Sequence, residues 1–172
     1  MRRKERLVSD EHEIEKIIRD CSHVILGLQA SGAPYLVPLN FGYAPGKIYL
    51  HSALQGRKAE ILRAAGGSVQ ASLAFVSKAE ILEKGTTACD LSTRYASVLA
   101  EGRLEEVTDP DEKLRGLASI LEQTGIQNRA FPEGAAKAVM VLCFTINEIS
   151  GKKNVPERDD SAICPDPEQE NG

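Results

Sequence analysis

Tryptophan is absent from this 172-residue chain, and aromatic residues make up only 5% of it. Proteins that bind single-stranded nucleic acid stack bases on aromatic side chains. The formal net charge of −4 also gives no reason to expect a nucleic-acid partner. No apolar run approaches the ~20 residues that a membrane-spanning helix needs. We therefore expect neither a nucleic-acid nor a membrane partner.

The four cysteines show no CxxC pairing, which zinc sites commonly use; they are Cys21, Cys89, Cys143 and Cys164. We expect reduced thiols, no metal site and no disulfide framework. The N-terminus is charged and no hydrophobic segment follows it, so we expect no signal peptide. These features together predict a cytoplasmic protein.

The length and composition fit one globular domain with a tail. Apolar residues make up 42% and charged residues 27% of the chain, as in ordinary soluble proteins. The last residues are rich in Pro, Asp and Glu and offer little to bury. We expect a folded domain over residues 1–153 and a disordered acidic tail over residues 154–172, with Cys164 as an exposed thiol.

Three segments carry helix signals. Asp10 and Asp109 can each cap a helix, because an acid follows three residues later. Another helix is expected over residues 55–65, ending at the glycine pair 66–67. The expected buried faces are Ile14, Ile17, Ile18 and Cys21 in the first helix, and Leu114, Leu117, Ala118 and Leu121 in the last.

The remaining regular segments favour strands joined as hairpins. Pro45-Gly46 predicts a turn between two of them, and Gly102 predicts a bulge or a close backbone approach. Residues 79–84 fit either a strand end or one helical turn. The expected strands cover residues 24–28, 35–41, 47–50, 69–76, 94–107 and 138–149. The fold class is therefore mainly β with helices (α+β), with about six antiparallel strands closed into a barrel.

Polar groups gather where residues 47–52 leave the sheet and the next helix starts. A helix that begins near Gln55 would direct free N–H groups outward beside Arg57 and Lys58. Such an arrangement suits a phosphate. A solvated basic turn also accounts for these residues, since Gly-Arg-Lys is common at helix starts.

The order PYLVPLNF, IYLHSA and GRKAEIL resembles the flavin-binding hairpin and helix of the split-barrel flavoproteins. These are the pyridoxamine 5'-phosphate oxidase-like family, which binds flavin mononucleotide (FMN). One branch, related to the nitroimidazole-resistance (Nim) proteins, carries R-R-x-x-R and H-x-A-x-x-G-x-K segments. Residues 2–6 and 51–58 are similar to them, and the resemblance spans residues 1–153.

This resemblance implies a homodimer with FMN in a groove where two subunits meet. It places Val37, Pro38, Leu39 and Asn40 along the flavin ring, His51 and Ser52 beside it, Arg57 and Lys58 on the phosphate, and Ser97 approaching from the partner strand. Leu36 and Leu39 also fit plain barrel core.

The resemblance further implies an oxidoreductase that reduces a small acceptor, nitroaromatic or quinone-like, with electrons from a reduced nicotinamide. Oxidation of pyridoxamine phosphate is not expected, because the chain lacks Trp and the W-x…R-type terminal segment. His51 is the candidate catalytic residue, since imidazole titrates near neutral pH. It can also simply pack on the ring.

Other functions stay open at this point. The chain can be a non-catalytic flavin-binding protein that acts as a sensor or store. It can also be a cofactor-free split barrel that serves as an interaction module. A haem-binding variant would need His23, His51 or Cys89 as a ligand, and no spacing supports it. The visible spectrum of the purified protein separates these cases.

Overall fold

The computed structural model describes residues 4–30, 32–77, 79–126, 129–132 and 134–154. The expected tail beyond residue 154, and Arg2 and Arg3, lie outside the described residues. Within the described part the strands are β1 (Leu7–Val8), β2 (Val24–Leu28), β3 (Tyr35–Leu39), β4 (Phe41–Ala44), β5 (Lys47–Ser52), β6 (Ser68–Val76), β7 (Glu80–Glu83), β8 (Leu91–Glu106) and β9 (Met140–Asn154). The α-helices are α1 (Glu11–Arg19), α2 (Arg57–Ala64), α3 (Pro110–Gln123) and α4 (Ala135–Ala138), and short 3-10 helices are η1 (Lys4–Arg6) and η2 (Ala88–Asp90).

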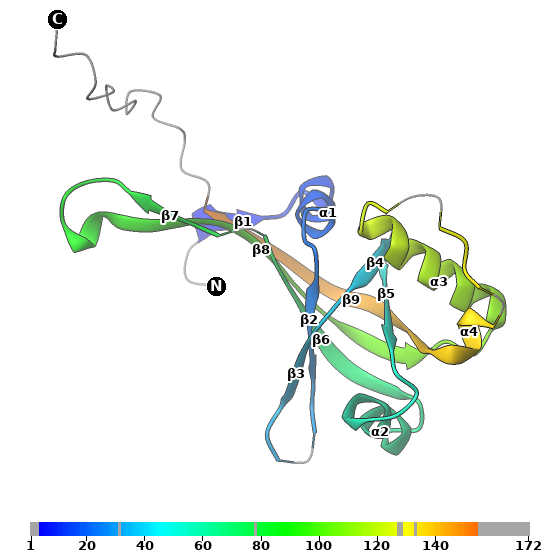
Figure 1. Cartoon of the computed structure of the whole chain (residues 1–172). Helices are drawn as coiled ribbons and strands as arrows, with labels where there is room; N and C mark the ends of the chain where they lie inside the picture. Colours follow the sequence, from blue (N-terminus) through cyan, green and yellow to red (C-terminus); the bar gives the residue numbers. More distant parts are fainter. Residues whose placement is uncertain (1–3, 31, 78, 127–128, 133, 155–172) are drawn as a thin grey trace, which may run out of the picture.

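The strands form one antiparallel sheet that curls into a split barrel (Figure 1). Its main path runs β3-β2-β6-β8-β9-β5-β4, with β1 paired to β9 and β7 paired to β8. The two ends of this path, β3 and β4, are consecutive in the chain and meet at Asn40. The expected fold class is therefore confirmed, although the sheet has nine strands within the described residues.

The extra strands arise partly because the expected strand over residues 35–41 divides at Asn40. β3 pairs with β2, whereas β4 pairs with β5 around the Pro45-Gly46 turn. Gly46 has φ 74°, a conformation that glycine adopts without steric cost. The predicted turn is thus confirmed, but a single strand over residues 35–41 was wrong. Asn40 is the corner where the chain changes its partner strand.

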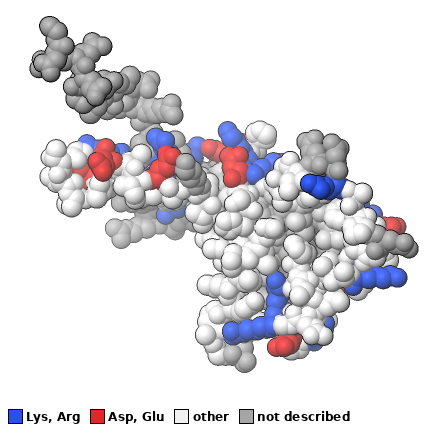
Figure 2. Space-filling view, in the orientation of Figure 1, with Lys and Arg blue, Asp and Glu red and all other residues white. Residues whose placement is uncertain are grey.

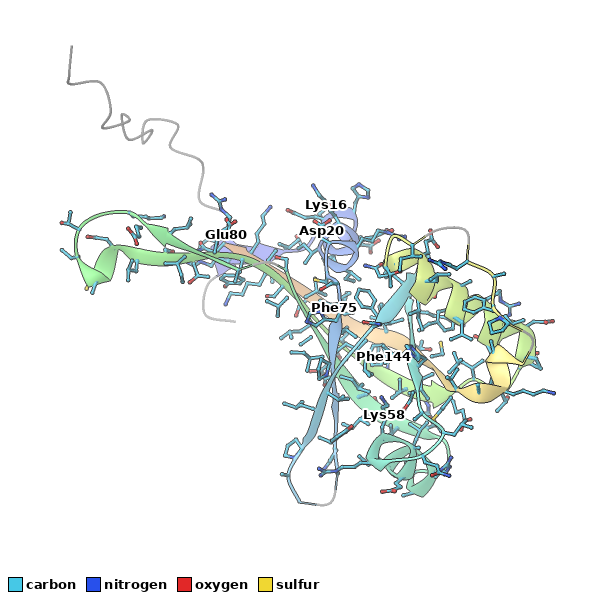
Figure 3. The ribbon with its side chains drawn as sticks, viewed as in Figure 1. Lys16, Asp20, Lys58, Phe75, Glu80 and Phe144 are labelled. Atoms are coloured by element: carbon cyan, nitrogen blue, oxygen red, sulfur yellow. The ribbon has the colours of Figure 1, made fainter. Side chains whose placement is uncertain are left out.

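The barrel interior is filled by aliphatic and aromatic side chains. Phe41, Phe75 and Phe144 are fully buried, and the Phe41 and Phe75 rings meet edge to face at 5.1 Å. Figure 3 shows Phe75 and Phe144 between the strands. Helix α1 packs its expected face on this core, and its cap is confirmed, since the Glu13 N–H donates to Asp10 Oδ1 at 2.8 Å.

Gly102 marks a bulge between β8 and β9, as predicted. The pairing register shifts between Glu101 and Gly102. A Cβ added at Gly102 would lie 2.0 Å from the backbone oxygen of Thr145, so only glycine fits. Strand β9 begins at Met140 rather than at Ala138, which belongs to α4, and it runs on past the expected end.

Helix α3 lies on the outer side of β4, β5 and β9. Its predicted cap is confirmed, because Asp109 Oδ1 accepts from the Glu112 N–H at 2.7 Å. The predicted buried face is right only in part: Leu117 packs against the core under α3, but the buried residues are Gly116 and Ile120, and Leu114 is 41% exposed.

Glycines explain which side of α3 faces the sheet. A Cβ on Gly116 would meet the Tyr49 ring at 2.8 Å, and a Cβ on Gly42 would meet Ser119 Oγ at 2.2 Å. The helix therefore approaches the strands so closely that its glycine side, rather than its leucine-rich side, faces inward.

Strand β7 and the start of β8 form an arm that projects from the barrel (Figure 1). The open choice for residues 79–84 is thus resolved as a strand. The arm carries exposed Ile81 and Leu91, and η2 with Cys89 lies at its tip. Strand β8 begins three residues earlier than residue 94 because its first part pairs with β7.

Candidate functional site

The first turn of α2 lies between two barrel strands and presents a cation to each. The Arg57 guanidinium carbon is 5.1 Å from the centre of the Tyr35 ring on β3. Lys58 is only 8% exposed and interacts electrostatically with His51 on β5. Successive helical side chains point about 100° apart, so these adjacent cations face different directions.

Glycines define both ends of α2. Gly56 is the N-cap, with φ 104° and ψ 174°, a backbone conformation that is essentially restricted to glycine. Because glycine has no side chain to cap the helix, the first-turn N–H groups are left available to another acceptor. At the other end, the Gly66 N–H donates to Arg63 O and the Gly67 N–H to Leu62 O. These bonds form a Schellman motif and confirm the predicted end of the helix.

Two polar side chains lie together at this helix start: His51, which is half-buried, and Lys58, which is buried. His51 Nδ1 is buried and has no hydrogen-bond partner among the residues that the structure describes. Burial, and secondly the nearby Lys58, lowers the pKa of His51, and burial also lowers the pKa of Lys58. Among the described residues, no carboxylate lies within ion-pair distance of Lys58. An anion is the group that would pair with the buried Lys58.

The candidate flavin-ring residues lie on β3, an edge strand, and at the corner after it. Val37 and Leu39 pack against the barrel core, whereas Pro38 and Asn40 are exposed. At the end of β5, strand alternation puts Ser52 on the side of the buried Leu50 and His51 on the opposite side. The backbone of β3 and the end of β5 thus flank the first turn of α2.

Ser97 does not join the α2 site within one chain. It lies on β8 opposite Val76, and its hydroxyl donates to Lys152 O at 3.5 Å. Its side chain shares a side of the sheet with Leu99, two residues along β8. The structure therefore separates Ser97 from Arg57, Lys58 and His51.

An apolar surface, here called the outer sheet face, covers β3, β2, β6 and β8. Leu36 is 67% exposed on it, so the expectation that Leu36 belongs to the barrel core was wrong. The sheet register aligns the other members of this face in one row across the four strands: Pro38, Ile25, Ala74 and Leu99.

The other candidate ligands lie apart from one another. His23 is exposed and shares a hydrogen bond of 2.8 Å with Ser22 Oγ, and Cys89 is exposed on the arm. Within the described ranges, no group of three or more His, Cys, Asp or Glu residues is arranged to hold a metal. In that same part of the chain, no helix is long and apolar enough to cross a membrane.

Sequence reasoning missed the surface beside Arg57. Tyr35 stacks on Arg57, and a groove lined by Glu60 and Ile61 continues along α2. Positions 57, 61 and 64 fall on one side of a helix, and this spacing could have indicated that this side of α2 lines a groove. Contact with β2 and β3 could not be foreseen from that stripe.

Solved structures with this architecture include flavoproteins. A candidate 5-nitroimidazole antibiotic resistance protein from Bacteroides thetaiotaomicron is 27% identical, with a TM-score of 0.74 and 85% of each chain covered. The flavocytochrome Anf3 from Azotobacter vinelandii is 20% identical, with a TM-score of 0.75, over 90% of this chain and 72% of that one.

An FAD-binding protein from Mesorhizobium loti is 21% identical, with a TM-score of 0.61, over 87% of this chain and 98% of that one. Because the last two are under 25% identical, they support the split-barrel fold alone. A search of curated proteins gives no match. The model of one family, described as pyridoxamine 5'-phosphate oxidase, matches residues 10–153. The chain therefore belongs to the pyridoxamine 5'-phosphate oxidase family.

Proposed function

We propose that this chain is a flavin-dependent oxidoreductase that binds FMN through the first turn of α2. The observation that carries this proposal is the buried Lys58 beside His51, whose Nδ1 is buried and has no hydrogen-bond partner in the described part of the chain. Both groups lie at a helix start whose N-cap residue, Gly56, has no side chain. A phosphate fits the buried cation and the uncapped helix start, and family membership makes a flavin phosphate the natural candidate.

The residues of the chain would bind and orient the cofactor. Lys58 and Arg57 would donate charge-assisted hydrogen bonds to the phosphate, and the first-turn N–H groups would add to them. The backbone of β3 near Val37 and Asn40 would lie along the ring, with His51 and Ser52 at its side. A bound phosphate would also offset the cost of burying Lys58.

When bound, the flavin supplies the redox chemistry, and the protein positions the substrate. We propose that a reduced nicotinamide donates two electrons and that a nitroaromatic or quinone-like acceptor receives them. The nitroaromatic class is suggested by similarity to the candidate nitroimidazole resistance protein. Protons for the reduced acceptor would come from water or from His51.

The visible spectrum of the purified protein, before and after addition of a reduced nicotinamide, tests this function. We expect a flavin spectrum that bleaches with the donor and returns when a nitroaromatic acceptor is added. A colourless protein that takes up no added flavin would contradict the proposal. Bound flavin without turnover would instead identify a flavin-binding protein that lacks reductase activity.

We also propose that the chain forms a homodimer through the outer sheet face. Large contiguous apolar patches are uncommon on monomers and mark interaction surfaces. In the view of Figure 2, the surface over β2, β3 and β6 is mostly uncharged, whereas the arm carries both signs of charge. Ser97 and Pro38 lie on this face, so a second copy docked there would bring Ser97 toward the flavin site of its partner.

Light scattering with simultaneous flavin absorbance is expected to give twice the mass of one chain and one flavin per subunit. Leu36→Arg should yield monomers with reduced flavin content, because it puts a charge into the apolar contact. Ile126→Arg, at an exposed position outside that face, is the matched control and should remain a dimer. A stable wild-type monomer with a filled flavin site would rule out this arrangement.

A further inference from the structure

Helix α3 leaves part of its leucine pattern outside the barrel. Leu114 is 41% exposed, because Gly116 and Ile120 take the inward positions. It lines a groove of about 480 Å³ between α3, α4 and residues 131–132, here called the α3–α4 groove. In Figure 1 the two helices lie side by side at the end of the molecule away from the arm. The volume of the groove falls in the range of about 300–1,000 Å³ that is typical of small-molecule sites.

The walls of this groove are largely apolar and come from three segments. Backbone hydrogen bonds hold the wall that α4 forms. The Ala135 N–H donates to Pro132 O at 3.1 Å, and the Lys137 N–H donates to Gly134 O at 2.8 Å. Phe131 is 37% exposed, so its ring is accessible to an aromatic ligand. The apolar lining consists of Pro110, Leu114, Phe131, Pro132, Ala135 and Ala136.

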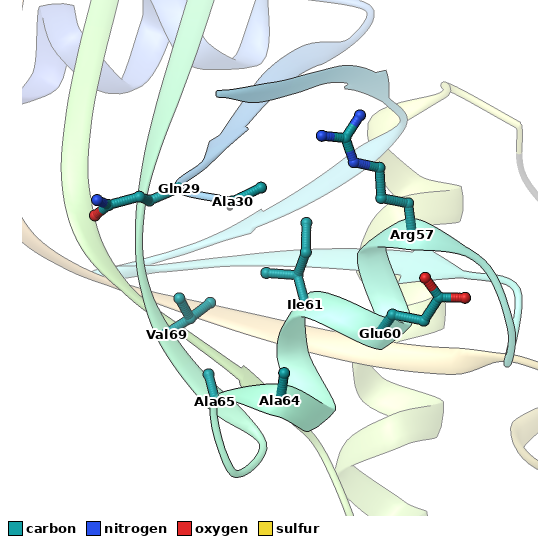
Figure 4. Close-up of a pocket in the computed structure, with 8 residues that line it drawn as sticks. All are labelled: Gln29, Ala30, Arg57, Glu60, Ile61, Ala64, Ala65 and Val69. Atoms are coloured by element: carbon teal, nitrogen blue, oxygen red, sulfur yellow. The ribbon is translucent and has the colours of Figure 1, made fainter. Parts of the chain in front are cut away.

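The charged residues that line the α3–α4 groove are both lysines. Lys113 is half-buried in its wall, and Lys137 is exposed on α4. Among the described residues that line the groove, none is acidic. The groove along α2 differs, because Arg57 and Glu60 both line it (Figure 4). The α3–α4 groove therefore suits an anion, whereas the groove along α2 carries charges of both signs.

Two carboxylates at the start of α3 have other partners. Asp109 Oδ1 accepts from the Glu112 N–H and lies 4.0 Å from an Arg115 guanidinium nitrogen. Glu112 Oε1 accepts from the Tyr49 hydroxyl at 3.2 Å, on the side of the helix that faces the barrel. Within the described ranges, no carboxylate lies within ion-pair distance of either groove lysine. Both lysines are thus available to an anionic ligand.

The start of α3 offers little to a phosphate. Phosphate sites at helix starts use free backbone N–H groups. Pro110, the first residue of α3, has no N–H, and the Glu112 N–H already donates to Asp109. A carboxylate carries one negative charge and can be bound by lysine side chains alone. The groove therefore favours a carboxylate over a phosphate.

We propose that the α3–α4 groove is a binding site for a small aromatic carboxylate. The ring would pack against Leu114 and Phe131. The carboxylate would accept charge-assisted hydrogen bonds from Lys113 and Lys137. Thr108, which also lines the groove, has a hydroxyl that can donate a further hydrogen bond. None of these residues belongs to the candidate flavin site, so this inference does not rest on the proposed function.

Calorimetric titration of the purified protein with 2-naphthoate and with 2-naphthalenemethanol tests the proposal. The two ligands share the ring system, and only the first carries a charge. We expect 2-naphthoate to bind with a dissociation constant of about 0.1 mM or below. We expect the alcohol to bind about tenfold more weakly, because it forms no charge-assisted hydrogen bond with the lysines. Absence of saturable 2-naphthoate binding, or equal affinities for the two ligands, would overturn the proposal.

Replacing both groove lysines by glutamine isolates their contribution. In the variant with Lys113→Gln and Lys137→Gln, the preference for the acid over the alcohol should disappear, while the affinity for the alcohol stays unchanged. Lys16→Gln with Lys84→Gln removes the same two charges at exposed positions outside the groove. This matched control should keep the preference. A preference for the acid that survives in the groove variant would contradict the assignment of the lysines.

A large side chain in the groove should exclude both ligands. Ala136 lines the groove, so Ala136→Trp is expected to abolish saturable binding of the acid and of the alcohol. Ala138→Trp, at an exposed alanine of α4 that is not among the lining residues, is the matched control and should bind both. Unchanged binding in Ala136→Trp would contradict the site. If the preference for the acid were lost instead in a variant with Arg57→Ala and Lys58→Ala, the acid would occupy the proposed flavin site, and the inference would be overturned.

Discussion

Replacing Arg57 and Lys58 together by alanine is expected to lower flavin affinity by about two to four orders of magnitude. Each charge-assisted hydrogen bond to the phosphate contributes about 1–3 kcal/mol, and a tenfold change in affinity corresponds to about 1.4 kcal/mol. Flavin content after purification, and the dissociation constant of the refilled protein, measure the effect. Wild-type flavin occupancy in the double variant would place the phosphate site elsewhere.

A matched control separates local contacts from a general change in charge. Lys84 and Arg129 are exposed cations outside the α2 site, and their joint replacement by alanine removes the same two positive charges. We expect this control to retain its flavin. If both double variants lost affinity equally, long-range electrostatics rather than direct contacts would be responsible.

Loss of Lys58 is expected to lower flavin affinity without lowering the folding stability of the flavin-free protein. Burial lowers the pKa of Lys58, so the protonated form is less favourable in the folded chain than in the unfolded one. This difference costs folding free energy in full below the lowered pKa of the folded state, and the cost fades as the pH rises from that pKa to the pKa of the unfolded state. Removal of Lys58 should therefore not destabilise the flavin-free barrel, and we expect the double variant to lose flavin while it stays folded. Thermal unfolding of the flavin-free proteins at neutral pH provides the comparison.

The elements that the sequence predicted best carry their own local signals. The strand over residues 24–28 has the expected bounds, and the caps at Asp10 and Asp109 form as predicted. The glycine pair 66–67 ends α2 through two backbone hydrogen bonds. Each feature depends on a few neighbouring residues, and such short-range rules can be applied without knowing the fold.

The features that the sequence did not predict depend on contacts between distant segments. Asn40 ends one strand pair and begins another. Asparagine is uncommon in strands, but residues 35–41 alone do not show that the chain changes its partner strand there. The buried side of α3 is chosen by the fit of Gly116 against Tyr49, whereas the leucine pattern favours another side. Tertiary packing thus overrode the periodicity of the helix.

The candidate site likewise combines features that its local sequence predicts with features that depend on the folded barrel. The basic turn and the helix start were visible as a motif, and their position between β3 and β5 follows from the barrel. The sequence treated Arg57 and Lys58 as one pair. The structure separates them, because Lys58 is buried near His51 while Arg57 lines the groove along α2. That distinction exists only once the helix has docked.

His51→Gln is expected to retain flavin and to slow acceptor reduction by the pre-reduced protein by about 10²-fold or more. Glutamine can still form hydrogen bonds, but it cannot deliver a proton. His51 lies at the end of β5 beside Lys58, and burial together with Lys58 lowers its pKa. The protonated form, which donates the proton, is therefore lost at a lower pH than for a free imidazole.

The pH dependence of acceptor reduction gives this prediction its sharpest test. In the wild-type protein the rate should fall as the pH rises through the pKa of His51, because the proton donor disappears. The His51→Gln variant should lack that dependence. His23→Gln, at an exposed histidine that is hydrogen-bonded to Ser22, is the matched control and should keep both the rate and its pH profile.

Flavin content is measured first in every variant. An unchanged rate with flavin retained would make His51 structural, and loss of flavin would assign it to cofactor binding rather than to proton transfer.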